Sequence, residues 1–251
     1  MKLQHATWQE VERYLERATG IIIPIGSTEQ HGPNGLLGTD AICPETVAWE
    51  LGERHDVLVG PTQSLGMAQH HLAFPGSISL RPSTLIAVLH DTVTSLARHG
   101  FTHLFFLNGH GGNIATTQAA FAEIWADASL SCDTSRLHLK LGNWFAGPRV
   151  RKLAQELFGE ADGKHATASE VSLTWHAYPD EQRSAELEPE RAPDGPIRDA
   201  AGYRASFPDG RIASEPQRAT REFGRRFYEA GLVDALEEYR QFTHSGDKAR
   251  S

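Results

Sequence analysis

Short apolar runs alternate with longer amphipathic stretches along the chain. Continuous apolar runs are typical of strands buried on both faces, and they are expected at 21–25, 56–60, 103–107 and 137–141. Apolar residues at every third or fourth position predict helices over 7–18, 40–54, 82–99 and 113–128. Because strands and helices alternate, the pattern predicts an α/β fold, a three-layer αβα sandwich around a mostly parallel sheet.

The end of the chain has a different composition. Residues 181–218 are rich in Pro, Arg, Glu, Asp and Gly and show weak periodicity. We interpret them as an irregular surface excursion of a single domain spanning 1–251. A last amphipathic helix is expected over 215–240, and residues 244–251 are expected to be a frayed tail.

Charge and composition exclude several classes of protein. The 32 acidic residues outnumber the 24 basic ones, and no basic run of the nucleic-acid-binding type occurs, so no nucleic-acid partner is expected. No apolar run is long enough for a membrane span, and the first residues lack a signal-peptide core. Cys43 and Cys132 are far apart in the sequence, and we expect both to be reduced thiols. These features predict a cytoplasmic protein without membrane contact.

A glycine-rich polar loop follows the first predicted strand and contains candidate metal ligands. Glu29 and His31 are two residues apart, so in an extended segment their side chains share a direction. Asp40 follows after a short loop, at the expected N-cap of the next helix. Carboxylate and imidazole donors suit Zn²⁺, Mn²⁺ or Fe²⁺. The alternative is that these side chains only cap the helix and stabilise the loop.

A second polar loop, 108–113, leaves the buried strand 103–107 and places His110 between glycines. A histidine there has no packing role, and its small neighbours allow close approach to a metal. The loop could instead cradle phosphate, but it lacks the Lys-Ser/Thr pair of a P-loop. Both loops lie at carboxyl ends of parallel strands, where α/β sheets bind ligands. We therefore expect one shared metal site.

A third segment resembles the start of a helix. His165 lies near its N-terminus and Glu170 about a turn and a half later, so both side chains could face the site. The alternative is an ordinary surface helix.

Four motifs in this order resemble the creatininase (creatinine amidohydrolase) family: IGSTEQHGPNGLLGTD, FPGSISL, NGHGGN and HATASEVS. The resemblance implies a three-layer αβα fold, a dinuclear divalent-metal centre and often a cyclic hexamer. It also implies metal-ligand roles for Glu29, His31, Asp40 and His110, with Asp40 as the bridging carboxylate. His165 would then be an acid/base residue.

The sequence departs from creatininase at one ligand position. Gly112 stands where creatininase has a metal-binding glutamate, and the resemblance implies that Glu170 supplies the missing carboxylate. Glu170 could act as a ligand, which we prefer, or as a catalytic base. Thr167 and Val171 also differ from the residues usual in the family. These differences leave metal chemistry intact and count against creatinine as substrate.

The expected function is metal-dependent hydrolysis of a non-peptide C–N amide bond, either in a cyclic amide such as creatinine or in a formamide. Two divalent ions, Zn and/or Mn with Fe as an alternative, would activate the water. The alternatives are a peptide-modifying hydrolase of the same family and a non-catalytic metal-binding member. A homo-oligomer is expected, with the hexamer suggested by the resemblance. Candidates for binding the small amide substrate are His71, Trp144, Trp175 and Asn113.

Overall fold

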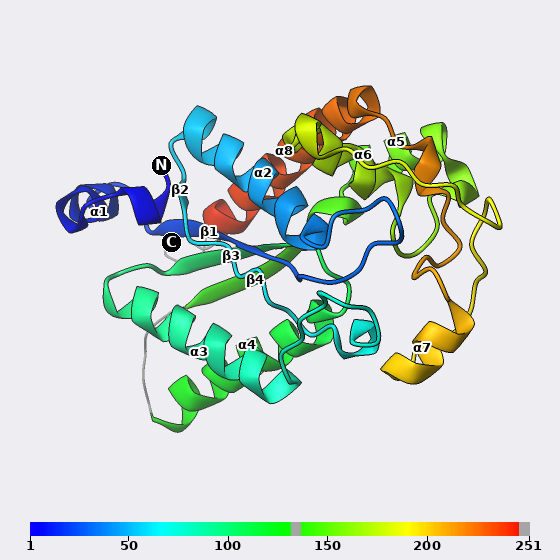
Figure 1. Ribbon diagram of the computed structural model, residues 1–251. Coiled ribbons are helices and arrows are strands. Elements are labelled where there is room, and N and C mark those ends of the chain that lie inside the picture. The colour runs from blue at the N-terminus through cyan, green and yellow to red at the C-terminus, as the bar shows by residue number, and fades with distance from the viewer. Residues whose placement is uncertain (132–136, 246–251) are drawn as a thin grey trace.

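The computed structural model describes residues 1–131 and 137–245, and it has a sheet between two layers of helices (Figure 1). Within these residues the sheet has four strands, all parallel, in the order β2, β1, β3, β4. Their bounds are Leu58–Val59, Gly20–Ile25, His103–Asn108 and His138–Asn143, respectively. The predicted αβα fold with a parallel central sheet is confirmed.

The strand register aligns the carboxyl ends of the three longer strands. Asn108 pairs with Ile25 on one side and with Asn143 on the other. The Asn108 side-chain amide also donates to Oδ1 of Asn143 at 2.8 Å. The loops that leave β1, β3 and β4 therefore start side by side.

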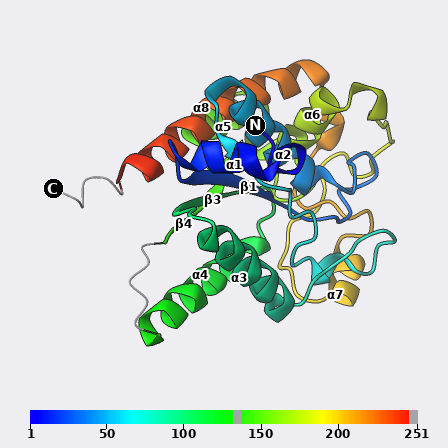
Figure 2. The same cartoon turned by 90° about the vertical axis from the view of Figure 1, so that its left-hand side faces the viewer.

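Alternate residues of the central strands pack against opposite helix layers. Ile22 and Phe105 face one layer, formed by α2 (Thr39–His55), α5 (Pro148–Leu157), α6 (Ala168–Ala177) and α8 (Arg221–Ser245). Ile21 and Phe106 face the other, formed by α3 (Pro82–Arg98) and α4 (Asn113–Leu130), with α1 (Trp8–Leu15) at its margin (Figure 2). Burial on both faces explains the continuous apolar runs in the sequence.

Two predicted boundaries near the first two strands are wrong. The helix expected to begin with Asp40 as its N-cap has Gly38 there instead, so Asp40 lies inside the first turn. The strand expected at 56–60 is reduced to 58–59 because Asp56, at φ 53°, is the left-handed cap of α2. Further along the chain, Ile78 forms an isolated bridge with Thr28.

The last helix also differs from the prediction. It begins at Arg221 because residues 216–218 form a 3₁₀ turn, opened by a proline, and Ala219 is extended. At its other end it continues to Ser245, and residues 246–251 of the predicted tail lie outside the described residues. Cys132 also lies outside them, whereas Cys43 is a free, buried thiol.

The segment 181–218 is mostly irregular but is anchored to the rest of the molecule. It contains α7 (Ala200–Ser206), and its apolar side chains form a small buried cluster with Phe74. Arg211 in this segment is fully buried and donates to backbone carbonyls of residues 189, 190 and 214. The excursion therefore forms a fixed wall beside the carboxyl end of the sheet. No helix in the described part of the chain is long and apolar enough to cross a membrane.

Candidate metal centre

The two polar loops meet because glycines let α2 approach the end of the sheet. A Cβ atom on Gly26 would lie 2.2 Å from the backbone carbonyl oxygen of Asp40, and one on Gly109 would lie 2.0 Å from the same atom. The backbone N–H of Gly109 also donates to the carbonyl of Ile25 at 2.9 Å. These contacts bring the first turn of α2 directly over the ends of β1 and β3.

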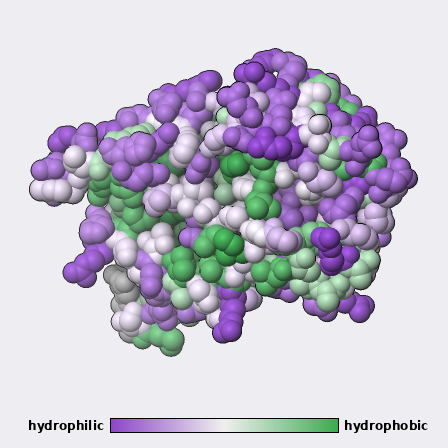
Figure 3. Space-filling view, in the orientation of Figure 1, coloured by the Kyte–Doolittle hydropathy of each residue, from purple (hydrophilic) through white to green (hydrophobic). Residues whose placement is uncertain are grey.

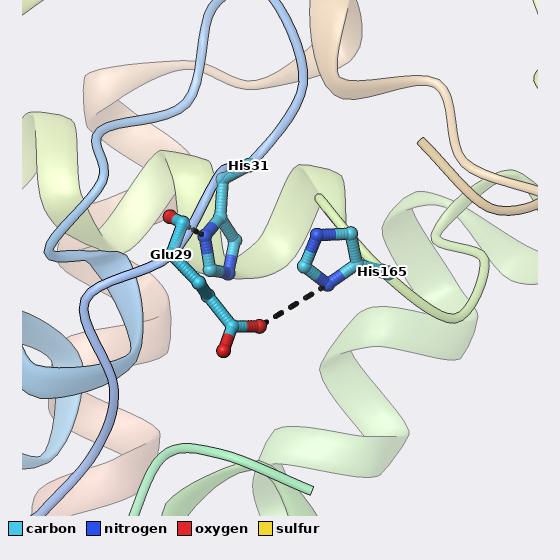
Figure 4. A group of neighbouring side chains, drawn as sticks. All are labelled: Glu29, His31 and His165. Atoms are coloured by element: carbon cyan, nitrogen blue, oxygen red, sulfur yellow. Dashed lines mark hydrogen bonds and ion pairs between the residues drawn. The ribbon is translucent and has the colours of Figure 1, made fainter. Parts of the chain in front are cut away.

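Three groups of potential metal ligands lie there among the described residues, and two of them share Asp40. Those two are Glu29, Asp40 and His110, and His31, Asp40 and Glu170; the third is Glu29, His31 and His165 (Figure 4). In each group the donor atoms lie within 4.8 Å of one another. Oδ2 of Asp40 lies 2.9 Å from Nδ1 of His110, and Oδ1 lies 3.1 Å from Nε2 of His31. The structure thus brings together the five predicted metal ligands.

Backbone carbonyls orient both histidines. Nδ1 of His31 lies 3.1 Å from the carbonyl oxygen of Glu29, which can only accept (Figure 4). In the neutral ring this nitrogen therefore carries the hydrogen, and Nε2 faces Asp40 with its lone pair. Likewise, Nε2 of His110 lies 3.0 Å from the carbonyl oxygen of Met67, which leaves Nδ1 as the free lone pair. Such outer contacts orient metal-binding histidines.

The cluster fits a cation. Asp40 and each neutral histidine would face one another as two acceptors at about hydrogen-bond distance, an arrangement that needs a cation or a proton between them. Oε2 of Glu29 and Oδ2 of Asp40 are buried and accept no hydrogen bond from any described residue. Burying carboxylates without partners is costly, and a divalent ion removes that cost. The mixed N/O donor set suits Zn²⁺, Mn²⁺ or Fe²⁺.

Without a cation, the cluster holds protons. Burial favours neutral His31, but the Asp40 carboxylate outweighs it and raises the His31 pKa to about 10. Burial is similarly outweighed at His110, where Glu29 and Asp40 raise the pKa to about 9. Burial also raises the pKa of Glu170 to about 7. Cations and protons therefore compete for the same atoms of the cluster.

The remaining candidates occupy different positions. Trp144 and His165 line a cavity of about 480 Å³ whose wall also includes Asp40, His110 and Glu170. Trp175 is not among its lining residues. His71 is almost fully buried, with Nε2 3.0 Å from Oε1 of Glu29. The side chain of Asn113 bonds the carbonyl of Gly26 and the N–H of Met67, which ties two loops together.

Sequence reasoning missed several residues around the cluster. Phe145 and Arg151 line the same cavity, and no periodic pattern distinguished them. Gln30 contacts both His71 and His165, and its position between Glu29 and His31 was a signal. The structure also explains Gly112, because a Cβ atom there would lie 2.3 Å from Nε2 of His110.

Residues 4–239 match the family model named Creatininase and described as creatinine amidohydrolase. The chain belongs to the creatininase family. It is 28% identical to creatinine amidohydrolase of Pseudomonas putida over 254 residues, which cover 92% of this chain and 94% of that protein. It is 34% identical over 108 residues to the mycofactocin precursor peptide peptidase of Mycolicibacterium smegmatis, covering 41% of this chain and 43% of that one.

Solved structures agree with the fold. The manganese form of creatininase superimposes with a TM-score of 0.82 at 24% identity, covering 96% of this chain and 98% of that one. A creatinine amidohydrolase homologue from Bacteroides fragilis gives a TM-score of 0.74 at 23% identity, covering 97% and 96%. The predicted family is confirmed, and the chain is a hydrolase of the creatininase family.

Proposed function

We propose that this creatininase-family protein hydrolyses a non-peptide C–N amide bond, in a cyclic amide such as creatinine or in a formamide, with two divalent ions. The observation that carries the proposal is the position of Asp40, whose two carboxylate oxygens face histidines of two different ligand groups. A carboxylate shared in this way is typical of a two-metal site. Structures of creatininase with manganese and in a Zn–Zn form support Zn and Mn as candidates.

Divalent ions at this position supply Lewis acidity to an amide carbonyl and acidify water. The protein's own groups provide the rest. Nδ1 of His165 lies 4.0 Å from Oε1 of Glu29, beside the ligand set, so its imidazole can transfer a proton to the leaving nitrogen (Figure 4). Glu170 acts as a ligand in the group with His31 and Asp40. Trp144 and Phe145 form the apolar wall that holds the substrate and excludes water.

A peptide substrate is the second candidate. The relatives include peptidases that act on a mycofactocin precursor peptide, and one of them is 34% identical in the matched region. A 3-dehydro-scyllo-inosose hydrolase of Thermotoga maritima, 26% identical over 175 residues, shows that relatives differ in substrate. A non-catalytic metal-binding role is disfavoured because His165 remains beside an intact ligand set.

Substrate hydrolysis tests the proposal directly. Protein loaded with Mn²⁺ or Zn²⁺ is incubated with creatinine, a lactam, a formamide and a peptide amide, with chelated protein as the control. Chelator-sensitive hydrolysis of a non-peptide amide is the expected result. Hydrolysis confined to the peptide would move the assignment to the second candidate. No hydrolysis by fully loaded protein would contradict the amide-bond proposal.

A homo-oligomer and a cytoplasmic location remain predictions. The face in Figure 3 is largely hydrophilic, with apolar side chains gathered near its middle. Large exposed apolar side chains on the loops around the site include Leu37, Leu72 and Ile78, and Leu37 lies against Gly76 next to the Ile78 bridge. We propose that a second copy covers these loops. Light scattering on the purified protein measures the assembly size.

A further inference from the structure

Gln30 lies between two ligands in the sequence, but its side chain points to a different set of partners. Its Nε2 atom lies 2.8 Å from Nδ1 of His71, 2.9 Å from Nε2 of His165 and 2.9 Å from the carbonyl oxygen of Gly210. The residue is 5% exposed, so water does not compete for these contacts. Gln30 therefore links the two histidines nearest Glu29 that are outside the two Asp40 ligand groups.

The orientation of the Gln30 amide is fixed at both of its ends. Its Oε1 atom accepts the backbone N–H of Gly32 at 2.9 Å, and the Gly210 carbonyl can only accept from Nε2. A flipped amide would lose both contacts. Nε2 thus supplies two hydrogens to the side where His71, His165 and Gly210 lie.

The side-chain amide of Gln30 determines which nitrogen of His71 is protonated, and its backbone carbonyl does so for His165. One of the two amide hydrogens goes to Gly210, which leaves one for a histidine. Nε2 of His165 lies 2.8 Å from the backbone carbonyl of Gln30, so that nitrogen is itself a donor and needs no hydrogen. The second amide hydrogen therefore goes to Nδ1 of His71. In the neutral rings both histidines carry their hydrogen on Nε2.

The same hydrogen position has opposite consequences because the rings face Glu29 differently. Nε2 of His71 lies 3.0 Å from Oε1 of Glu29, so the protonated nitrogen lies beside that carboxylate, although the two atoms form no hydrogen bond. His165 directs its Nδ1 to the same oxygen at 4.0 Å, so it presents a lone pair to the cluster. One histidine can stabilise the carboxylate by its nearby N–H dipole, while the other can accept a proton.

We propose that Gln30 is a positioning residue that assigns these roles: His71 orients Glu29 toward the metal, and His165 enters the reaction as a proton acceptor. The proposal rests on the amide hydrolysis proposed above. Nδ1 of His165 takes a proton from the attacking water as the oxygen–carbon bond forms. It returns that proton to the leaving nitrogen as the C–N bond breaks, so the net change is addition of one water.

The excursion 181–218 holds Gln30 in place. The hydroxyl of Tyr203 donates to the Gly210 carbonyl at 2.8 Å, and Arg211 anchors the same turn to three backbone carbonyls. Gly210 has φ +89°, and a Cβ atom there would lie 1.8 Å from Oε1 of Gln30. Because only glycine fits this position, Gly210 lets the irregular segment 181–218 come close enough to contact Gln30.

Gln30→Glu is the sharpest test because it keeps the shape and replaces the N–H donors with an acceptor. Histidine ¹⁵N spectra of the zinc-loaded wild-type protein should show His71 and His165 protonated on Nε2. In the variant His71 should gain a hydrogen on Nδ1. Zinc affinity should fall about 10- to 100-fold, as for other groups that orient metal ligands, and kcat should fall more than KM rises.

Gln30→Leu and Gly210→Ala provide second variants if Gln30→Glu folds poorly, because both remove the amide from His71 without adding a charge. Gln63→Glu is the matched control, since the Gln63 amide donates to the carbonyl of Leu65, at 2.7 Å, and to no other described residue. It should leave zinc affinity and the spectra unchanged.

Unchanged His71 protonation and zinc affinity in folded Gln30 variants would overturn the proposal. If the Gln30 variants show the predicted spectra and weaker zinc binding but the wild-type protein hydrolyses no amide, the proposed function is refuted. The positioning of His71 by Gln30 would still stand.

Discussion

The Glu170 carboxylate accepts a hydrogen bond from the backbone N–H of Thr167 at 2.6 Å. The Thr167 hydroxyl accepts the N–H of Glu170 in return, at 3.2 Å, so the two residues form a capping box at the start of α6. The same carboxylate lies 3.8 Å from Nε2 of His31 in the ligand cluster. Glu170 therefore connects the stability of a helix to the proposed metal centre.

Substitutions at Glu170 should separate these two roles. Glu170→Gln keeps an acceptor for Thr167 but removes the charge, so zinc content should fall by about half while the cation-free protein stays as stable. Glu170→Ala should lose the same zinc and also about 1 kcal/mol of unfolding free energy, measured by urea denaturation without metal. Glu10→Ala is the control, because Glu10 forms an equivalent capping box with Thr7 in α1. Glu10→Ala should lower the unfolding free energy and leave the zinc content unchanged. Full zinc occupancy in Glu170→Ala would contradict the ligand role.

Asp40 and His165 should differ in their effects on metal content. Asp40→Ala removes the carboxylate shared by both ligand groups, so bound metal, measured by elemental analysis, should fall below a tenth of the wild-type value, with no turnover. His165→Ala should retain the metal and lower kcat about 100-fold, the usual range for a lost proton-transfer group. Metal-stripped Asp40→Ala that still turned over substrate would refute the proposed mechanism.

Metal binding should release protons. Carboxylates raise the pKa of His31 to about 10 and of His110 to about 9, so both are protonated in cation-free protein at pH 7 and must lose a proton to bind metal. Affinity should therefore rise with pH up to about 9. In cation-free protein the raised pKa values of His31 and His110 mean that their protonation stabilises the fold fully below about pH 6.5. This contribution disappears as the pH passes 9 to 10. Zinc titration calorimetry in buffers of different ionisation heat counts the protons, and His31→Ala should reduce the number. Equal heats in all buffers would contradict the prediction.

The two tryptophans predicted to contact substrate should behave differently. Trp144 lines the cavity beside the cluster, whereas Trp175 does not. Trp144→Phe should raise KM about five-fold, corresponding to about 1 kcal/mol of lost ring contact. Trp175→Phe is the matched control and should leave KM within two-fold. An equal effect of both substitutions would show that stacking on Trp144 does not hold the substrate.

The sequence by itself determined the sheet and the location of the chemistry. The apolar runs of β1 and β3 are long enough to require burial on both faces, and the polar glycine-rich loops follow them directly. Parallel strands bring such loops to one edge, so Glu29, His31 and His110 could be placed together. The helix ends were predicted less well. The last helix begins six residues later than its amphipathic pattern suggested because a proline turn precedes it.

Only the tertiary structure decided which residues contact one another in the site. Asp40 bridges two ligand groups because Gly26 and Gly109 leave room for its backbone, a close approach that no periodicity encodes. Gln30 reaches Gly210, which lies 180 residues away in the chain, through a segment whose sequence looked irregular. Hydrophobic patterns specify which face of an element is buried. Hydrogen-bond partners across the fold depend on the final packing of several elements, and that packing brings His71 and His165 together around Gln30.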